Sequence, residues 1–338
     1  MAHALVLVVP GLLALPAAQL AATRSLATLG GYAGAPHSHT EGIAAALFTA
    51  LGVAPTTPVA PLALLGAGGD PGADYVLCAD PVHLVADRDT VVLAQVIDDL
   101  PAGDADVLVR MLDRHFADDD LRFEAVRPDA WFARRRQPAR IATTPPDVAR
   151  GRNLVAHLPR GSDSGTWKRW QDEIEMLLHE HPVNAAREAR REPAANAVWF
   201  WGGGRLAEVG RLPPAIVTAP DTRLGAVAHG IARHGAPAAP RIDDDLSHAL
   251  ARAARHGAAA VVVLAVLPPV AGDLRAVDAT WLAPALALLA ARRIASLHVV
   301  ADGNGAAATW TARPPGLWQR VAARASRHAF EIPSPPDA

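Results

Sequence analysis

Cysteine and lysine are almost missing from this chain of 338 residues. Cys78 is the one cysteine, so no disulfide can form within the chain and a zinc site built on several cysteines is excluded. Lys168 is the one lysine, and arginine supplies nearly all of the basic side chains. The 32 Lys and Arg residues meet 34 Asp and Glu residues, for a formal net charge of −2. Such a balance gives no general attraction to nucleic acids or anionic lipids, and we expect neither as a partner.

Long hydrophobic runs are also lacking. No uninterrupted apolar stretch approaches the roughly 20 residues that a membrane-spanning helix needs, so we expect no membrane span. The apolar run Ala4–Leu13 is broken by Pro10-Gly11 and has no basic residue before it, which argues against a signal peptide. A first buried strand explains this run better. With the single cysteine, this pattern favours a cytoplasmic location.

The pattern of apolar residues predicts an α/β fold. Hydrophobic residues make up 51% of the chain, which suffices for a sizeable core. Short continuous apolar runs are typical of strands buried on both faces, and helical stretches between them predict a doubly wound, largely parallel sheet. The expected strands are Ala4–Val9, Ala215–Thr218, Ala259–Val266 and Ser296–Ala301, and the expected helices are Arg223–His234, Asp244–His256 and Thr280–Arg293.

The middle of the chain is more charged and more often broken by turn residues. Its acidic run Asp118–Asp120 and basic run Arg134–Arg136 are typical of a solvated face. We expect the core to comprise residues 1–78 and 191–332, with residues 79–190 inserted as a cap or lobe and 333–338 as a disordered tail. Within the insert the sequence predicts a helix at Asp104–His115, a strand at Leu121–Val126 and a helix at Asp163–His181, capped by Ser162 or Asp163.

Two segments carry a resemblance to a known family. One is His179-Glu180-His181-Pro182-Val183-Asn184 followed by Arg187, and the other is the stretch Asn196–Gly204, which ends in three glycines. Together they resemble the archaeal-type cofactor-independent phosphoglycerate mutases, in which a similar element precedes an Asn-bearing strand ending in Gly-x-Gly. The sequence is more similar still to bacterial regulatory proteins of the RpfE type, themselves phosphoglycerate-mutase-like, including at Ala79–Leu84 and Gly151–Gly161.

The resemblance implies an alkaline-phosphatase-like core. In that superfamily two divalent metals held by Asp and His, with a Ser or Thr nucleophile, carry out the chemistry. Three expected ligand positions depart from this pattern: Pro10 stands before Gly11, only Asp273 remains in the loop from Pro268, and Asp302 is followed by Gly303 instead of His. The resemblance therefore predicts a degenerate metal site, no resident cofactor and a pseudoenzyme.

The stretch His37-Ser38-His39-Thr40 lies where the family would place its nucleophile. The two histidines could bind one metal, and Ser38 or Thr40 could then be phosphorylated. The alternative is an exposed polar turn that caps a helix over Gly42–Leu51. Both interpretations stay open.

Trp201, Gly202, Gly203 and Gly204 form the candidate ligand site. Glycines at a strand end let backbone N–H groups approach an anion, although a buried strand with a tight turn explains them equally well. The associated polar candidates are Asn184, Asn196 and Arg187, which could bind a phosphate as a fork. Nearby, Asp80 and His83 could form an acid/base pair, or Asp80 could stabilise the turn before Pro81.

Three functions remain in view. The leading one is a phosphoglycerate-mutase-like regulatory protein that binds a small phosphorylated metabolite or a protein partner. The second is a metal-dependent phosphomutase or phosphatase that holds Mn or Zn with unorthodox ligands. The third is a structural interaction protein without a ligand. The second function would recruit Asp273, Asp302, His37 and His39, with His229 or Asp221.

Overall fold

The computed structural model describes residues 3–87, 90–235, 246, 248, 250–251, 262–270, 273–316, 319 and 330. The chain divides into two compact units: the first comprises Met1–Thr57 and Gly210–Ala338, and the second Pro58–Val209. The second unit is larger than the predicted insert of residues 79–190. The reason is that the strand starting at Tyr75 and the strand ending at Gly204 pair with each other inside it.

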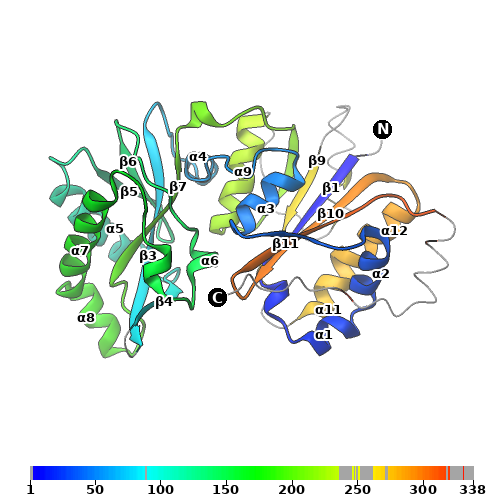
Figure 1. The fold of residues 1–338 in the computed structure, drawn as a ribbon, viewed down its shortest axis with the longest axis horizontal. Helices are drawn as coiled ribbons and strands as arrows, with labels where there is room; N and C mark the ends of the chain where they lie inside the picture. Colours follow the sequence, from blue (N-terminus) through cyan, green and yellow to red (C-terminus); the bar gives the residue numbers. More distant parts are fainter. Residues whose placement is uncertain are drawn as a thin grey trace. The chain divides into compact units, whose positions relative to one another are not determined.

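A six-stranded sheet forms the centre of the first unit (Figure 1), in the order β2-β11-β10-β1-β9-β8. β1 pairs in parallel with β10 and β9, and β9 pairs in parallel with β8. The prediction of four neighbouring parallel strands is confirmed, although residues 259–261 lie outside the described ranges. An antiparallel edge of β11 and β2 was not predicted. The strands are β1 (His3–Val9), β2 (His37–His39), β8 (Ala215–Thr218), β9 (Val262–Val266), β10 (Ile294–Gly303) and β11 (Ala306–Ala312).

Helices cover both faces of this sheet, which explains its continuous apolar strands. The side chains of Leu5, Leu7 and Val9 pack in one core with residues of α1, α2, α11 and α12. Figure 1 shows these helices on one side of the sheet and α3 and α9 on the other. The helices are α1 (Ala17–Ala22), α2 (Arg24–Ala33), α3 (Ile43–Ala50), α9 (Arg223–Gly235), α11 (Leu274–Val277) and α12 (Ala283–Ala290), with a π-helical turn η4 at Asp278–Leu282.

The helix predictions for this unit have mixed outcomes. Arg223–His234 is confirmed as α9, and most of Asp244–His256 lies outside the described residues. The predicted helix Thr280–Arg293 corresponds to the end of η4 and to α12, which stops at Ala290. It ends early because Arg292 adopts a φ of 57°, which turns the chain into β10.

The second unit contains an antiparallel sheet built around one long strand, β3. β3 pairs with β4 and β6 along one edge and with β7 along the other, and β5 pairs with β6. The predicted strand Leu121–Val126 is found as β5. The strands are β3 (Tyr75–Asp87), β4 (Thr90–Val96), β5 (Arg122–Arg127), β6 (Ala130–Arg135) and β7 (Ala197–Gly204).

The helices of the second unit pack on this sheet, and an aromatic core lies between them. Trp167 and Trp170 of α7 lie within contact of Phe116 and Phe200, because apolar residues recur at helical spacing along α7. The helix Asp104–His115 is confirmed. The predicted helix Asp163–His181 ends at His179, and the side chain of His181 caps the next helix. The helices are α4 (Ala60–Ala67), α5 (Ala102–His115), α6 (Pro146–Ala149), α7 (Ser164–His179) and α8 (Pro182–Ala189). Throughout the described ranges, no helix has both the length and the apolar character to cross a membrane.

Candidate functional site

The carboxyl end of the first sheet is where the resemblance would place a metal site. Val9 of β1 pairs with Ala301 of β10, so Asp302 lies at the end of this row of strands. Asp302 in turn pairs with Ala307 of β11, and Ala307 pairs with His39 of β2. Asp302 and His39 therefore lie at the same end of the sheet, with one residue of β11 between them.

Asp302 connects the end of β1 to the hairpin of β10 and β11. The backbone N–H of Gly11 donates to Oδ1 of Asp302 at 2.7 Å, and the Asn304 amide donates to the Leu13 carbonyl at 3.2 Å. Gly303 adopts a φ of 152°, and a Cβ at this position would collide with the backbone of residues 13 and 14. The hairpin thus packs directly on the turn after β1, and Asp302 holds the two together.

Asp273 has a comparable structural role. It is the N-cap of α11, and its Oδ1 accepts the backbone N–H of Ala276 at 3.0 Å. On the loop before it, the N–H of Val270 donates to the carbonyl of Pro10 at 2.9 Å. Both acidic candidates at this sheet end therefore accept backbone N–H groups.

The stretch from His37 to Thr40 is not the predicted exposed turn with a capping side chain. His37–His39 forms the edge strand β2, and the N-cap of α3 is Gly42, which makes no side-chain bond. His39 is buried, and its Nε2 hydrogen-bonds the Thr309 hydroxyl at 3.0 Å. Burial, together with the charge of His37, lowers the pKa of His39. The His37 and His39 rings meet edge to face with centroids 4.6 Å apart.

The other candidate metal ligands and nucleophiles do not form one site with His37 and His39. Ser38 and Thr40 are exposed, His229 lies in α9, and Asp221 lies in the bend after β8. Over the part of the chain that the structure describes, no group of three or more His, Cys, Asp or Glu side chains could hold a metal ion.

Arg187 and Asn184, two predicted ligand residues, are almost completely buried in the second unit. The Arg187 guanidinium donates to Oδ1 of Asp99 at 2.7 Å and to the carbonyl of Pro193 at 2.8 Å. The Asn184 amide donates to the carbonyls of Leu178 and Ala195 and accepts the N–H of Ala195. These bonds tie α8 to the segment that leads into β7.

Asn196 and Trp201 also make internal hydrogen bonds. The Asn196 amide bonds both backbone groups of Leu84, at 2.8 and 2.9 Å, and so extends the pairing of β3. The Trp201 indole donates to Asp80 at 2.6 Å, whereas the partner of the His83 ring is the carbonyl of Ala194. Asp80 and His83 thus have separate partners.

The three glycines at the end of β7 are required by close packing. A Cβ at Gly202 would lie 2.9 Å from Cβ of Val59, at the start of α4. A Cβ at Gly203 would collide with the Tyr75 hydroxyl, and one at Gly204 with the Pro58 ring. These glycines lie at the opposite end of β7 from Asn196, roughly 25 Å away at about 3.4 Å per residue. The structure therefore does not bring the seven predicted ligand residues to one place.

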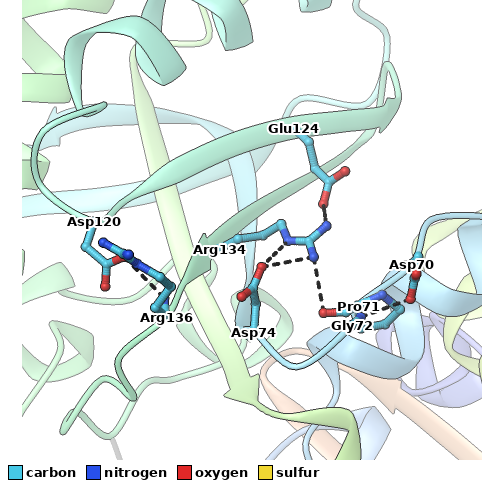
Figure 2. A network of polar contacts seen from close by, with 8 residues as sticks. All are labelled: Asp70, Pro71, Gly72, Asp74, Asp120, Glu124, Arg134 and Arg136. Atoms are coloured by element: carbon cyan, nitrogen blue, oxygen red, sulfur yellow. Dashed lines mark hydrogen bonds and ion pairs between the residues drawn. The ribbon is translucent and has the colours of Figure 1, made fainter.

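An arginine-lined cavity of about 510 Å³ lies elsewhere in the second unit. Three of its guanidinium groups are held by carboxylates. Arg134 donates to Asp74, Glu124 and the carbonyl of Pro71 (Figure 2), at 3.0–3.2 Å. In the same view Arg136 donates to Asp120 at 3.0 Å. Outside this view, Arg122 pairs with Asp113 at 3.0 Å. The cavity is lined by Arg122, Arg134, Arg135 and Arg136 with Asp74, Ala117, Asp118 and Asp120.

Two members of these ion pairs, Asp120 and Arg134, have shifted pKa values. Burial alone would raise the pKa of Asp120, but hydrogen bonds from the Arg136 side chain and from the backbone N–H of Gln137 and Arg136 lower it. Burial alone would lower the pKa of Arg134, but its bonds to Glu124 and Asp74 raise it. The interpretation of Arg134–Arg136 as a solvated face is wrong for Arg134, because only 23% of its side chain is exposed.

Arg135 differs from its neighbours because no carboxylate pairs with it in the described ranges. Its guanidinium carbon lies 5.2 Å from the centre of the Trp170 ring and 5.8 Å from that of Trp167. The Nε–H of Arg135 and both indole N–H groups are buried without an acceptor among the residues the structure describes. The cavity thus contains one arginine that forms no ion pair with a described carboxylate, although its charge is one of the causes that lower the pKa of Asp163. The sequence interpretation missed this arginine.

Comparison with known proteins supports the phosphoglycerate mutase likeness. No family model matches the sequence. The 2,3-bisphosphoglycerate-independent phosphoglycerate mutase of Methanothrix thermoacetophila is 35% identical over 88 residues, which cover 24% of this chain and 22% of that protein. A probable 2,3-bisphosphoglycerate-independent phosphoglycerate mutase of Geobacter sulfurreducens is 24% identical over 91 residues, covering 25% and 23%. The match thus spans less than a quarter of the length of each of these relatives.

Two solved structures align with most of the chain. The PH0037 protein of Pyrococcus horikoshii covers 92% of this chain and 87% of its own, with a TM-score of 0.51 and 14% identity. A cofactor-independent phosphoglycerate mutase from Thermoplasma acidophilum covers 93% and 90%, with a TM-score of 0.42 and 15% identity. The chain is therefore similar to phosphoglycerate mutases in part of its sequence and shares a mixed α/β fold with PH0037.

Proposed function

We propose that this protein is a phosphoglycerate-mutase-like binding protein, which takes a small phosphorylated metabolite into the arginine-lined cavity and performs no two-metal phosphoryl transfer. The observation that carries the proposal is Arg135, a guanidinium without a carboxylate partner in the described ranges, at the wall of a cavity of about 510 Å³. The proposal includes the alkaline-phosphatase-like arrangement and the regulatory role of the RpfE type that the resemblance implies.

The surroundings of Arg135 favour an anion of the size of a phosphate ester. A guanidinium offers several donors in a planar fork that matches the oxygens of a phosphate. Arg122, Arg134 and Arg136 are positioned by carboxylates, so their remaining donors need little reorganisation to contact a ligand. The indole rings of Trp167 and Trp170 make cation–π contacts with the Arg135 guanidinium. A cavity of this volume falls within the range of small-molecule sites.

The contacts at the end of the first sheet support the part of the proposal that concerns metal. Asp302 and Asp273 each already accept one backbone N–H, from Gly11 and Ala276, so part of each carboxylate is used to hold the fold. Pro10, beside them, has no side-chain ligand to offer.

Calorimetric titration with 3-phosphoglycerate, 2-phosphoglycerate and unphosphorylated glycerate tests the binding site. We expect saturable binding of the phosphorylated compounds only. Arg135→Gln should weaken it about tenfold to a hundredfold, because one charge-assisted contact contributes about 1.5–3 kcal/mol. The matched control is Arg110→Gln, which removes an exposed arginine of the same unit that pairs with Asp106 outside the cavity. Equal affinities of the Arg135→Gln variant and the wild type would refute this site.

Metal analysis and activity assays test the absence of two-metal chemistry. We expect no stoichiometric Mn or Zn in the purified protein and negligible mutase or phosphatase turnover with added Mn²⁺. Two equivalents of either metal, with turnover that is lost on chelation, would establish the enzyme alternative instead. The interaction-protein alternative gains if none of the phosphorylated compounds binds.

A further inference from the structure

A second cavity, of about 360 Å³, lies in the second unit between one face of α7 and the first half of β7. None of its lining residues lines the arginine cavity. Four polar side chains on its α7 wall face it: Lys168, Gln171, Asp172 and Glu175. These positions have the spacing i, i+3, i+4 and i+7, which places all four side chains on one face of the helix.

The charged groups of α7 fall into a paired set and an unpaired set. Away from the cavity, the Glu173 carboxylate pairs with Arg169 at 3.6 Å and with His115 at 3.1 Å. On the cavity face, Lys168, Asp172 and Glu175 form no ion pair or side-chain hydrogen bond with any described residue. The cavity therefore has one ammonium and two carboxylates that are exposed to solvent and that no described protein group neutralises.

The wall opposite α7 is apolar. Leu84, Leu158, Val198 and Trp199 line it, and its two polar groups are already bonded. The Asn196 amide bonds the backbone of Leu84, and the Trp199 indole donates to the carbonyl of Thr144 at 2.8 Å. A ligand in this cavity thus meets charged side chains on one side and mainly apolar side chains on the other.

The carboxylate end of the cavity favours a cation. Burial, and next the neighbouring charge of Asp172, raise the pKa of Glu175. A positive group placed between the two carboxylates would relieve both effects. The Lys168 ammonium lies one helical turn before Asp172, so it is the nearest group on this face for a negative charge.

We propose that this cavity binds a free amino acid with an apolar side chain. Its α-ammonium group lies between Asp172 and Glu175, its α-carboxylate contacts Lys168 and Gln171, and its side chain packs on Trp199, Val198 and Leu158. A zwitterion satisfies the single ammonium and the carboxylates together, whereas an ion of one sign satisfies only one of them. This site is independent of the phosphate-binding function proposed above.

The single lysine makes the site directly observable. Reductive ¹³C-dimethylation keeps the positive charge and labels one side chain, Lys168, so its methyl resonances report on the cavity. We expect L-leucine and L-phenylalanine to shift these resonances to saturation. N-acetyl-leucine and leucinamide, which each lack one of the two charges, should bind at least about tenfold more weakly.

Calorimetry with variants identifies the contacts. Lys168→Met and Glu175→Gln should weaken leucine binding about tenfold or more. Glu173→Gln, on the paired face of the same helix, is the control and should leave it unchanged. Phosphoglycerate binding should be the same in all three variants, which separates a failure here from a failure of the proposed function. No saturable shift with either amino acid, or equal binding of leucine and its two blocked derivatives, would overturn the inference.

Discussion

Replacing Arg187 by Ala should destabilise the second unit without changing its affinity for ligands. The resemblance pointed to this arginine as a phosphate contact, but its side chain is only 1% exposed and its donors are used inside the protein. One guanidinium nitrogen bonds Asp99 and another bonds the carbonyl of Pro193. The test therefore separates a structural role from a binding role at one position.

The magnitude follows from what the substitution leaves behind. The carbonyl of Pro193 loses its donor, which costs about 1–3 kcal/mol for a buried acceptor. The ion pair with Asp99 contributes less than a fully buried pair, because the Asp99 side chain is 54% exposed to water. Removing a long buried side chain also leaves a cavity. Together we expect a loss of about 2–5 kcal/mol in the free energy of unfolding.

Urea denaturation followed by tryptophan fluorescence measures this loss, because α7 and β7 of the second unit contain Trp167, Trp170, Trp199 and Trp201. Arg190→Ala is the control on the same helix: Arg190 is half exposed and bonds only Glu192, and its removal should leave the midpoint unchanged. An Arg187→Ala variant as stable as the wild type but unable to bind phosphoglycerate would refute the structural role and restore the original prediction.

Two further predictions concern stability. Gly203→Ala should lower the melting temperature, because its Cβ collides with the Tyr75 hydroxyl, and adding Tyr75→Phe should restore part of the loss in a thermal scan. Because the pKa of buried His39 is lowered in the folded state, the stability that depends on its neutral ring is present above its ordinary pKa of 6.5 and is lost as the pH falls below that value. His39→Gln should therefore reduce the difference in unfolding free energy between pH 7.5 and pH 5, and an unchanged difference would contradict this explanation.

The parallel strands could be predicted because burial on both faces leaves a clear pattern in the sequence. β1, β8 and β9 consist almost entirely of apolar residues, and β10 contains the apolar run Val299–Ala301, as expected for strands buried on both faces. The edge strands β2 and β11 have no such pattern. β2 has three polar residues, and β11 consists mainly of Ala and Thr. The Asn304-Gly305 pair between β10 and β11 was the available signal, since this dipeptide is typical of a tight hairpin.

The candidate site was harder to predict, because the sequence does not tell a polar side chain bonded inside the protein from one that contacts a ligand. Arg187, Asn184 and Asn196 have the residue types of a phosphate site, yet backbone carbonyls and Asp99 use their donors. The opposite error was made for Arg135. Because alternate residues of a strand face opposite sides, Arg135 was bound to differ from Arg134 and Arg136, but the aromatic rings below it come from α7 and were not foreseeable.

The position of β1 at the centre of its sheet has a consequence for synthesis on the ribosome. β1 is made before its two neighbours, β9 and β10, which both follow more than 250 residues later. At translation rates of about 5–20 residues per second, its two edges stay without partners for roughly 13–50 s. The second unit, Pro58–Val209, is complete well before then. Nascent chains therefore contain a folded inner unit preceded by an unpaired apolar strand, which is the kind of segment that chaperones bind.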